Sequence, residues 1–503
     1  MNKFLCISLF SLLALGCGDD DPMMMTPDAT PDSSLPDGMM PDGSTPDAMA
    51  DAGPTLNVPT HYEFESRCMA GESSISHSGQ SARQILMIEL SSFIGGLTAA
   101  IDDSSYDPTT MDVTDRLSYY YSLSGDDRAG DALDFSTTPA LDQMTWGDIS
   151  GARLQNKLSP NDSATDQFAM GGRTFAGWSD ASVLTGGATE INPPNLIEGW
   201  FQIIEDQALA RANGTEATSR TDIPVYVTDN GVDLRQLINK LLIVAVAFSQ
   251  GADDYLDDDV DGKGLLASNE CGDSTYTALE HAWDEGVGYF GAANNYSDWT
   301  TDVLAGPSSG RCNDVDMSGG IDAVYECNYG MAVNAAKRDK GSSMIAATSY
   351  RRQIWDAFRT GRALITAADG PLSADELTQL RAQRDLVVTG WEQVIMGTSL
   401  HYINDTLEAL STCGTGAYDY LDHIKYWAEM KAYGLAAQFN RNTPMTTGQF
   451  AELHGIFGDA PVLCDDPALE GHKAALRRAR MVLATAYGFA PGLLGDENGI
   501  GGW

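Results

Sequence analysis

Six consecutive residues combine one imidazole with three carboxylates: Glu280-His281-Ala282-Trp283-Asp284-Glu285. Side chains of these types can hold a divalent metal ion or transfer protons. Only seven histidines occur in 503 residues, so a histidine flanked by three acids is a candidate for chemistry. The segment predicts a divalent-metal or proton-relay site, with these candidate ligands: His281, Asp284, Glu285 and Glu280.

The period of a helix places these side chains relative to the core. At about 100° per residue, Leu279 and Trp283 belong to one apolar stripe. His281 and Glu285 are neighbours four residues apart on another side of the helix, and Glu280 lies at the border of the stripe. This arrangement favours a solvated polar face, so a metal site here requires a second helix that covers it.

Two acidic stretches resemble the beginning of a calcium-binding EF-hand loop. The first has acids or hydroxyls at positions 1, 3, 5 and 9 and glycine at position 6, which gives the candidate ligands Asp314, Asp316, Ser318 and Asp322. Its twelfth position is Tyr325, and Glu326 comes one residue later, which departs from the EF-hand pattern. The alternative is a turn closed by a disulfide.

The second stretch has acids at positions 1, 3 and 5 and glycine at position 6, with the candidate ligands Asp257, Asp259 and Asp261. It also predicts calcium binding. The alternative is a solvated acidic turn.

The N-terminus is typical of an export signal. Lys3 precedes an apolar run, and Ala14-Leu15-Gly16-Cys17 resembles a bacterial lipobox. The sequence therefore predicts a signal peptide over residues 1–17 and a lipid anchor at Cys17 that attaches the protein to the membrane. Gly18 follows the anchor, which favours an outer-membrane lipoprotein of the cell envelope that faces the periplasm or the cell surface.

Export to an oxidising compartment makes disulfides the default for the remaining cysteines. Six cysteines allow 15 pairings. Proximity along the chain favours Cys312–Cys327 and Cys413–Cys464, which leaves Cys68–Cys271.

The overall charge is strongly negative, with 71 acids, 30 bases and a net charge of −41. Such a chain would be repelled by phosphates, which argues against nucleic-acid binding and favours cation binding or solubility alone. Residues 18–58 repeat Pro-Asp among Met, Ser, Thr and Gly, and this composition predicts a disordered tether.

The rest of the chain, residues 59–503, predicts an all-α fold of two related helical bundles with long irregular loops, divided near residue 342. Apolar periodicity predicts helices over 80–101, 195–212, 231–251, 275–293, 326–369 with a break near 341, 373–411, 416–439 and 466–487. Residues 103–192 are rich in Gly, Ser, Thr and Asp and predict a loop-heavy insertion. Residues 283–292 resemble residues 427–436, which indicates a duplicated half or the chance similarity of two amphipathic helices.

Several blocks together resemble an uncharacterised domain-of-unknown-function family of bacterial lipoproteins related to imelysin. The blocks are Tyr62-Glu63-Phe64-Glu65, Ser78-Gly79-Gln80-Ser81-Ala82-Arg83, residues 280–291, Asn334-Ala335-Ala336-Lys337-Arg338-Asp339, Phe358-Arg359-Thr360-Gly361-Arg362, Tyr426-Trp427-Ala428-Glu429-Met430-Lys431 and Ala486-Tyr487-Gly488-Phe489. The resemblance spans residues 60–490 and implies a helical two-bundle fold.

Imelysin-like proteins are linked to iron uptake and carry a Gly-x-His-x-x-Glu motif. His281 and Asp284 supply a histidine and an acid at that spacing, but Leu279 and Asp284 replace the motif's Gly and Glu. The resemblance implies a cation-binding envelope lipoprotein, without enzymatic activity, that takes part in metal uptake with an envelope transport or surface partner. The alternatives are a metal-dependent hydrolase, if His401 or His423 lies near His281, and a tethered interaction module with calcium for rigidity.

Overall fold

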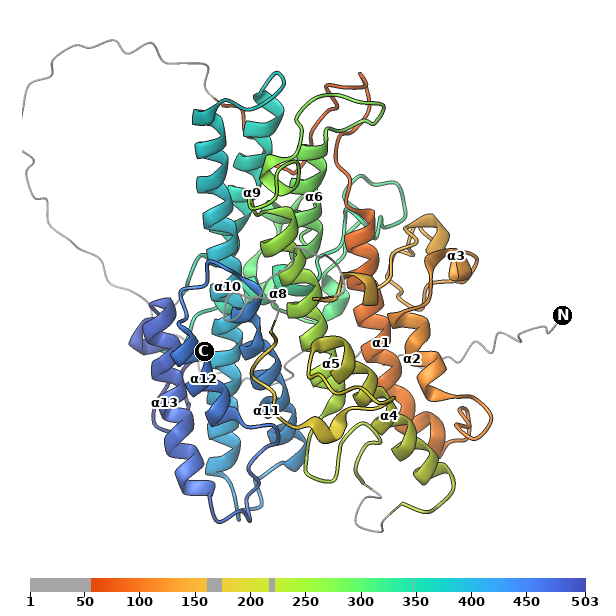
Figure 1. Cartoon of the computed structure of the whole chain (residues 1–503), viewed down its shortest axis with the longest axis vertical. Coiled ribbons are helices and arrows are strands. Elements are labelled where there is room, and N and C mark those ends of the chain that lie inside the picture. Colours follow the sequence, from red (N-terminus) through yellow and green to blue (C-terminus); the bar gives the residue numbers. More distant parts are fainter. Residues whose placement is uncertain (1–55, 161–173, 217–221, 346) are drawn as a thin grey trace, which may run out of the picture.

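The computed structural model describes residues 56–160, 174–216, 222–345 and 347–503. Cys17, the predicted signal peptide and almost all of the predicted tether lie outside these residues. Within them the fold consists of helices and long loops without a β-strand, so the all-α prediction is confirmed (Figure 1). The α-helices are α1 (Ser78–Asp102), α2 (Val113–Tyr121), α3 (Gly125–Arg128), α4 (Pro193–Ala212), α5 (Leu234–Leu242), α6 (Ala278–Phe290), α7 (Thr301–Leu304), α8 (Gly330–Asp339), α9 (Tyr350–Ala367), α10 (Ala374–Ser411), α11 (Tyr420–Gly434), α12 (Thr447–Phe457) and α13 (Leu469–Tyr487).

The long helix α10 runs through the molecule and packs against α9 and α11 (Figure 1). The buried apolar side chains form one cluster that extends along the chain from Tyr62 to Trp503. Helix α1 is long and apolar enough to cross a membrane, but 56% of its most apolar window is buried in this fold. The predicted division into two bundles near residue 342 stays a prediction.

Local capping explains where several helices begin. Ser373 accepts the N–H of Glu376 through its hydroxyl, and the Glu376 side chain accepts the N–H of Ser373. Thr277 and Glu280 make the same reciprocal pair at the start of α6. Each pair satisfies two backbone donors that a helix start otherwise leaves free. The predicted start of the long helix at residue 373 is thereby confirmed.

Most predicted helices are present, with two kinds of difference. The segment predicted as one helix over 231–251 is α5 followed by π-helical turns over Ile243–Phe248 and Gln250–Tyr255. Helices α2 and α12 were not predicted. Both are short, and they are held by tertiary burial of side chains such as Tyr120 and Phe450 rather than by a long local pattern.

The two disulfides that proximity favours, Cys312–Cys327 and Cys413–Cys464, are present, and the remaining cysteines form Cys68–Cys271. Cys68–Cys271 joins the N-terminal segment to the loop before α6. Cys312–Cys327 closes the acidic loop that resembles an EF-hand.

Helices α6 and α9 approach each other closely because α9 has a glycine, Gly361, at the contact. A Cβ atom on Gly361 would lie 2.1 Å from the indole ring of Trp283. The indole Nε1 of Trp283 donates to the carbonyl oxygen of Phe358 at 2.9 Å. This contact places the next residue of α9, Arg362, against the acidic side of α6.

Candidate cation-binding sites

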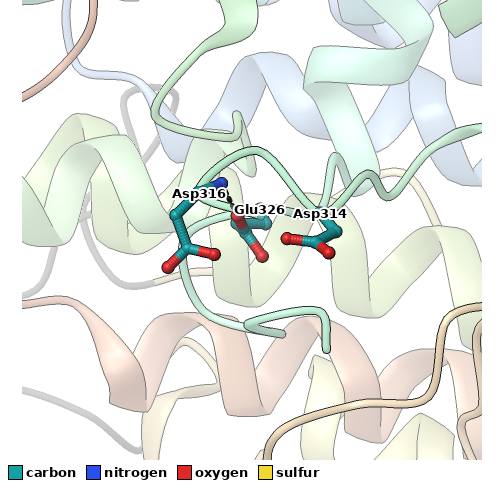
Figure 2. A group of neighbouring side chains, drawn as sticks. All are labelled: Asp314, Asp316 and Glu326. Atoms are coloured by element: carbon teal, nitrogen blue, oxygen red, sulfur yellow. Dashed lines mark hydrogen bonds between the residues drawn. The ribbon is translucent and has the colours of Figure 1, made fainter. Parts of the chain in front are cut away.

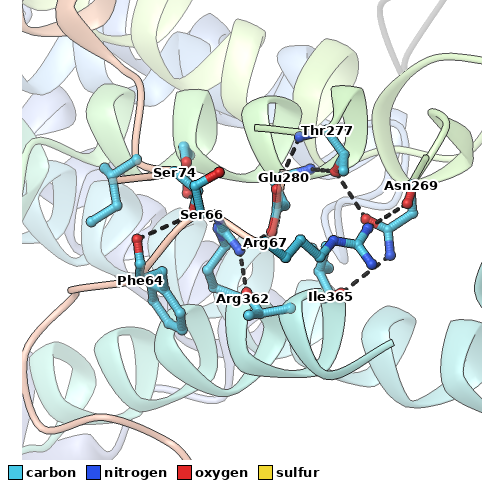
Figure 3. Close-up of polar contacts among 12 residues, drawn as sticks. Phe64, Ser66, Arg67, Ser74, Asn269, Thr277, Glu280, Arg362 and Ile365 are labelled. Carbon is cyan, nitrogen blue, oxygen red and sulfur yellow. Dashed lines mark hydrogen bonds and ion pairs between the residues drawn. The ribbon is translucent and has the colours of Figure 1, made fainter. Parts of the chain in front are cut away.

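Two acids of the 280–285 cluster are fully buried rather than solvated. Glu280 and Asp284 both have an exposed fraction of 0%, and so does Arg362 of α9. The guanidinium Nη1 donates to Glu280 Oε1 at 2.9 Å, and Nε donates to Asp284 Oδ1 at 3.0 Å. Figure 3 shows Glu280 and Arg362 between their helices. The expectation of a solvated face is therefore wrong for these two acids, because α9 covers them and brings its own cation.

Further donors complete this buried cluster. Tyr62 donates its hydroxyl to Asp284 Oδ1 at 2.6 Å, and the N–H of Ser76 lies 3.2 Å from Asp284 Oδ2. Arg362 Nη2 donates to Ser74 Oγ at 2.6 Å. Burial raises the pKa of Asp284, while the guanidinium and these hydrogen bonds oppose the rise. The cluster thus ties the N-terminal segment to α6 and α9, and the guanidinium stands where a metal ion was predicted.

His281 and Glu285 lie beside this cluster and remain partly open to solvent. Their side chains are 33% and 17% exposed, and His281 Nε2 lies 3.8 Å from Glu285 Oε1. His281 Nδ1 lies 3.1 Å from the carbonyl oxygen of Ser76, which can only accept a hydrogen bond. Nδ1 must therefore carry a proton, and Nε2 faces the carboxylate of Glu285. Gln80 Nε2 donates to Glu285 Oε1 at 2.6 Å and holds it in place.

The second predicted calcium loop is also neutralised by an arginine. Arg441, from the chain after α11, lies 2.6 Å from Asp259, 2.5 Å from Asp253 and 3.5 Å from Asp257. Burial, together with the hydrogen bond and the charge of Asp259, raises the pKa of Asp257 to about 9. Asp261 is exposed and stands outside this group. The guanidinium thus provides the positive charge for these acids.

The loop closed by Cys312–Cys327 is different. Asp314, Asp316 and Glu326 each offer one carboxylate oxygen, and these three oxygens lie within 4.8 Å of one another (Figure 2). None of the ion pairs among the described residues involves these three acids. Asp314 Oδ1 is shielded from solvent and accepts no hydrogen bond in the described part of the chain. The loop therefore concentrates negative charge without a basic side chain to balance it.

The backbone of this loop is organised around Glu326, which is 7% exposed. Its Oε1 accepts the N–H groups of Val315 at 2.7 Å and Asp316 at 3.2 Å, and its Oε2 accepts the N–H of Asp322 at 2.8 Å. Asp322 Oδ1 instead accepts the N–H of Val324 at 2.7 Å. The structure thus brings Asp314 and Asp316 together and adds Glu326.

Of the predicted acidic ligands of this loop, Asp322 stands outside the carboxylate group. The N–H of Ser318 donates to Asp316 Oδ1 at 2.8 Å, as in a local turn. Glu326 lies one residue past the twelfth EF-hand position, and this offset is the signal in the sequence for its part in the group.

The histidines considered for a hydrolase have other neighbours. His401 Nε2 lies 3.3 Å from Asp405, and His423 Nδ1 lies 3.0 Å from the Tyr418 hydroxyl. No described contact joins either of them to His281. The residues that sequence reasoning missed are the two arginines, because a basic residue inside an amphipathic helix or a loop gives no sign of which acid it will meet.

Comparison with known proteins bears on part of the chain. Residues 194–389 match the family model described as "Domain of unknown function (DUF4856)". The chain matches no curated protein. It also matches no solved structure. The matched region includes α6, all of α9 and the disulfide-closed acidic loop, whereas Tyr62 and Arg441 lie outside it. The chain therefore contains a DUF4856 domain, a domain of unknown function, over residues 194–389.

Proposed function

We propose that this protein is an exported lipoprotein of the bacterial cell envelope that binds cations, with calcium bound in the disulfide-closed loop. The observation that carries the proposal is the convergence of Asp314, Asp316 and Glu326 without a basic partner. In the two other acidic clusters the carboxylates form ion pairs with an arginine, so the same molecule contains both neutralised and unneutralised acidic clusters. The lipobox-like residues around Cys17 and the resemblance to imelysin-related lipoproteins support the cellular setting.

Calcium fits the chemistry of this loop. It takes six to eight oxygen ligands in flexible geometry, and carboxylates, backbone carbonyls and water all serve. Three carboxylates held close together repel one another, and a divalent ion removes this repulsion. The disulfide restricts the loop before the ion binds, which lowers the entropy cost of binding. Extracellular calcium modules bind with dissociation constants on the order of 10⁻⁴–10⁻³ M, and we expect this range.

Calcium titration of the full-length protein tests the proposal. The wild type should bind calcium in isothermal titration calorimetry, and its Tm should be higher in calcium than in EGTA, because an ion that binds only the folded state stabilises it. Asp314→Asn should lose both effects. Asp302→Asn is the matched control, since Asp302 is an exposed acid of α7 near the loop. Equal calcium binding by wild type and Asp314→Asn would exclude the loop as the site.

A second cation site, for iron or another transition metal, is favoured by the partly exposed position of His281 Nε2 beside the carboxylate of Glu285. Metal analysis of purified protein should show less transition metal in His281→Ala than in the wild type. His61→Ala is the control, because His61 has a similar exposed fraction of 32% and also pairs with acids. Equal metal content in all three proteins would remove His281 from the proposal.

The two alternatives make different predictions in the same experiments. A tethered interaction module with structural calcium would show calcium-dependent melting and no transition metal. A metal-dependent hydrolase would lose activity on a model peptide after His281→Ala. Replacement of Cys17 by serine should abolish lipid attachment, measured as the intact mass of the mature protein.

A further inference from the structure

Residues 132–145 form a strap that leaves the core and returns to it. Ala132 and Thr145 form a bridge at its base, and the N–H of Leu133 donates to the carbonyl of Met144 at 3.3 Å. Leu141 is the one buried residue among these fourteen. A segment with so little burial depends on a few hydrogen bonds for its position.

The base of the strap is held by a buried carboxylate. Glu89 of α1 is 3% exposed, and its Oε1 accepts the N–H groups of Asp134 and Phe135, both at 2.8 Å. This attachment belongs to the helical core and does not involve the acidic loop.

The outer part of the strap is held by the acidic loop instead. The N–H of Asp142 donates to the carbonyl oxygen of Ile321 at 2.9 Å, and the N–H of Ile321 donates to the carbonyl of Ala140 at 3.0 Å. The N–H of Ala323 donates to Gln143 Oε1 at 2.9 Å. Among the described residues, all hydrogen bonds that join residues 139–143 to the chain after residue 148 are made with the acidic loop.

The carboxylate of Asp142 also lies directly against the loop. Its Oδ1 is 1.8 Å from the position that a Cβ atom on Gly320 would occupy. Only a glycine allows this approach. No hydrogen bond or ion pair of the described residues involves the Asp142 carboxylate, so it places a further uncompensated negative charge against the loop at Gly320.

We infer that cation binding in the acidic loop fastens the outer part of the strap to the core, with Asp142 as the strap's own charged contact. The inference rests on the proposed calcium site. Glu326 Oε2 accepts the N–H of Asp322. Asp322 lies between Ile321 and Ala323, the two loop residues that form hydrogen bonds with the strap. An ion on Glu326 stabilises this segment of the loop and screens the charge of Asp142. The strap is thus a calcium-dependent element of the surface.

Hydrogen–deuterium exchange of the full-length protein tests this coupling. Calcium should slow exchange of the amides in residues 139–145 by about tenfold or more relative to EGTA, because opening of the strap becomes less favourable. Exchange at Asp134 and Phe135 should change little, since Glu89 holds them. Asp142→Asn should weaken calcium binding about tenfold, and its strap should show less protection at a fixed calcium concentration.

Each outcome has a separate meaning. If calorimetry shows calcium binding that Asp314→Asn abolishes, but exchange over 139–145 is unchanged by calcium, the coupling is wrong and the calcium site stands. If calcium protects the strap equally in Asp314→Asn, another ion site is responsible and the coupling is also wrong. If the wild type binds no calcium, the proposed function itself fails.

Discussion

Replacing Arg362 with methionine would leave two carboxylates buried without their cation. Glu280 and Asp284 have an exposed fraction of 0%, and each accepts a hydrogen bond from this guanidinium. Removing one partner of a buried ion pair costs about 3–5 kcal/mol, because the remaining charge is desolvated and uncompensated. We expect Arg362→Met to lower the free energy of unfolding by this amount.

The matched control is Arg352→Met, in the same helix. Arg352 is 84% exposed and lies 3.6 Å from Asp356. Exposed ion pairs contribute about 0–1 kcal/mol, so this variant should differ little from the wild type. Urea unfolding with the disulfides intact, followed by circular dichroism, gives both free energies.

The pH dependence of the Arg362→Met deficit gives an independent check. Without the guanidinium, the buried carboxylate of Asp284 holds its proton more tightly in the folded state than in the unfolded state. Stability is then greatest at low pH and is lost as the pH rises. The deficit relative to the wild type should therefore shrink between about pH 8 and about pH 5. A cost below about 1 kcal/mol, or a deficit independent of pH, would refute the account of this cluster as a buried arginine–carboxylate site.

Three other perturbations have defined outcomes. Burial raises the pKa of Glu392 from 4.5 to about 7. Its contribution to the free energy of unfolding is therefore full below the unfolded pKa and falls by roughly 3 kcal/mol as the pH rises to about 7. Glu392→Gln should remove this part of the pH dependence in urea unfolding between about pH 5 and pH 8, and an unchanged profile would contradict it. Gly361→Ala should destabilise the protein by about 1–3 kcal/mol, because the added methyl group meets Trp283. In the control Gly96→Ala, the added methyl group has no atom within 4 Å, so this variant should be neutral or more stable by up to about 1 kcal/mol. Equal unfolding midpoints for the two variants would argue against the close packing. Cys312→Ser should weaken calcium binding in calorimetry by about tenfold because the open loop must be ordered by the ion, and an unchanged affinity would show that the disulfide does not preorganise it.

The two buried arginine clusters and the acidic loop show how similar sequence patterns reach different chemistry. Residues 257–262 and 314–319 both have acids at positions 1 and 3, an oxygen-bearing side chain at position 5 and glycine at position 6. In the fold, Arg441 forms ion pairs with the first run, and among the described residues Asp314, Asp316 and Glu326 form none with a basic side chain. A pattern of acids thus identifies oxygen ligands, and the surrounding cations decide whether an external ion is needed.

Local features of the chain were readable from the sequence because they depend on neighbouring residues. The long helices follow from apolar residues at helical spacing, and the start at Ser373 follows from its pairing with Glu376 three residues later. The disulfide Cys312–Cys327 follows from a short separation of 15 residues. Asp314 and Asp316 are likewise set together by the loop that contains them both.

Only the tertiary structure decided which of the acids are already neutralised. Arg362 meets Asp284 across 78 residues, and Arg441 meets Asp253 across 188 residues. Helical periodicity gives the side of α6 on which an acid lies, but not which helix covers that side. The covering is set by the shape of the packed core, for example by the contact of Gly361 with Trp283. The sequence by itself determined where the candidate ligands are concentrated, and the packing of distant helices determined which of them remain available to a cation.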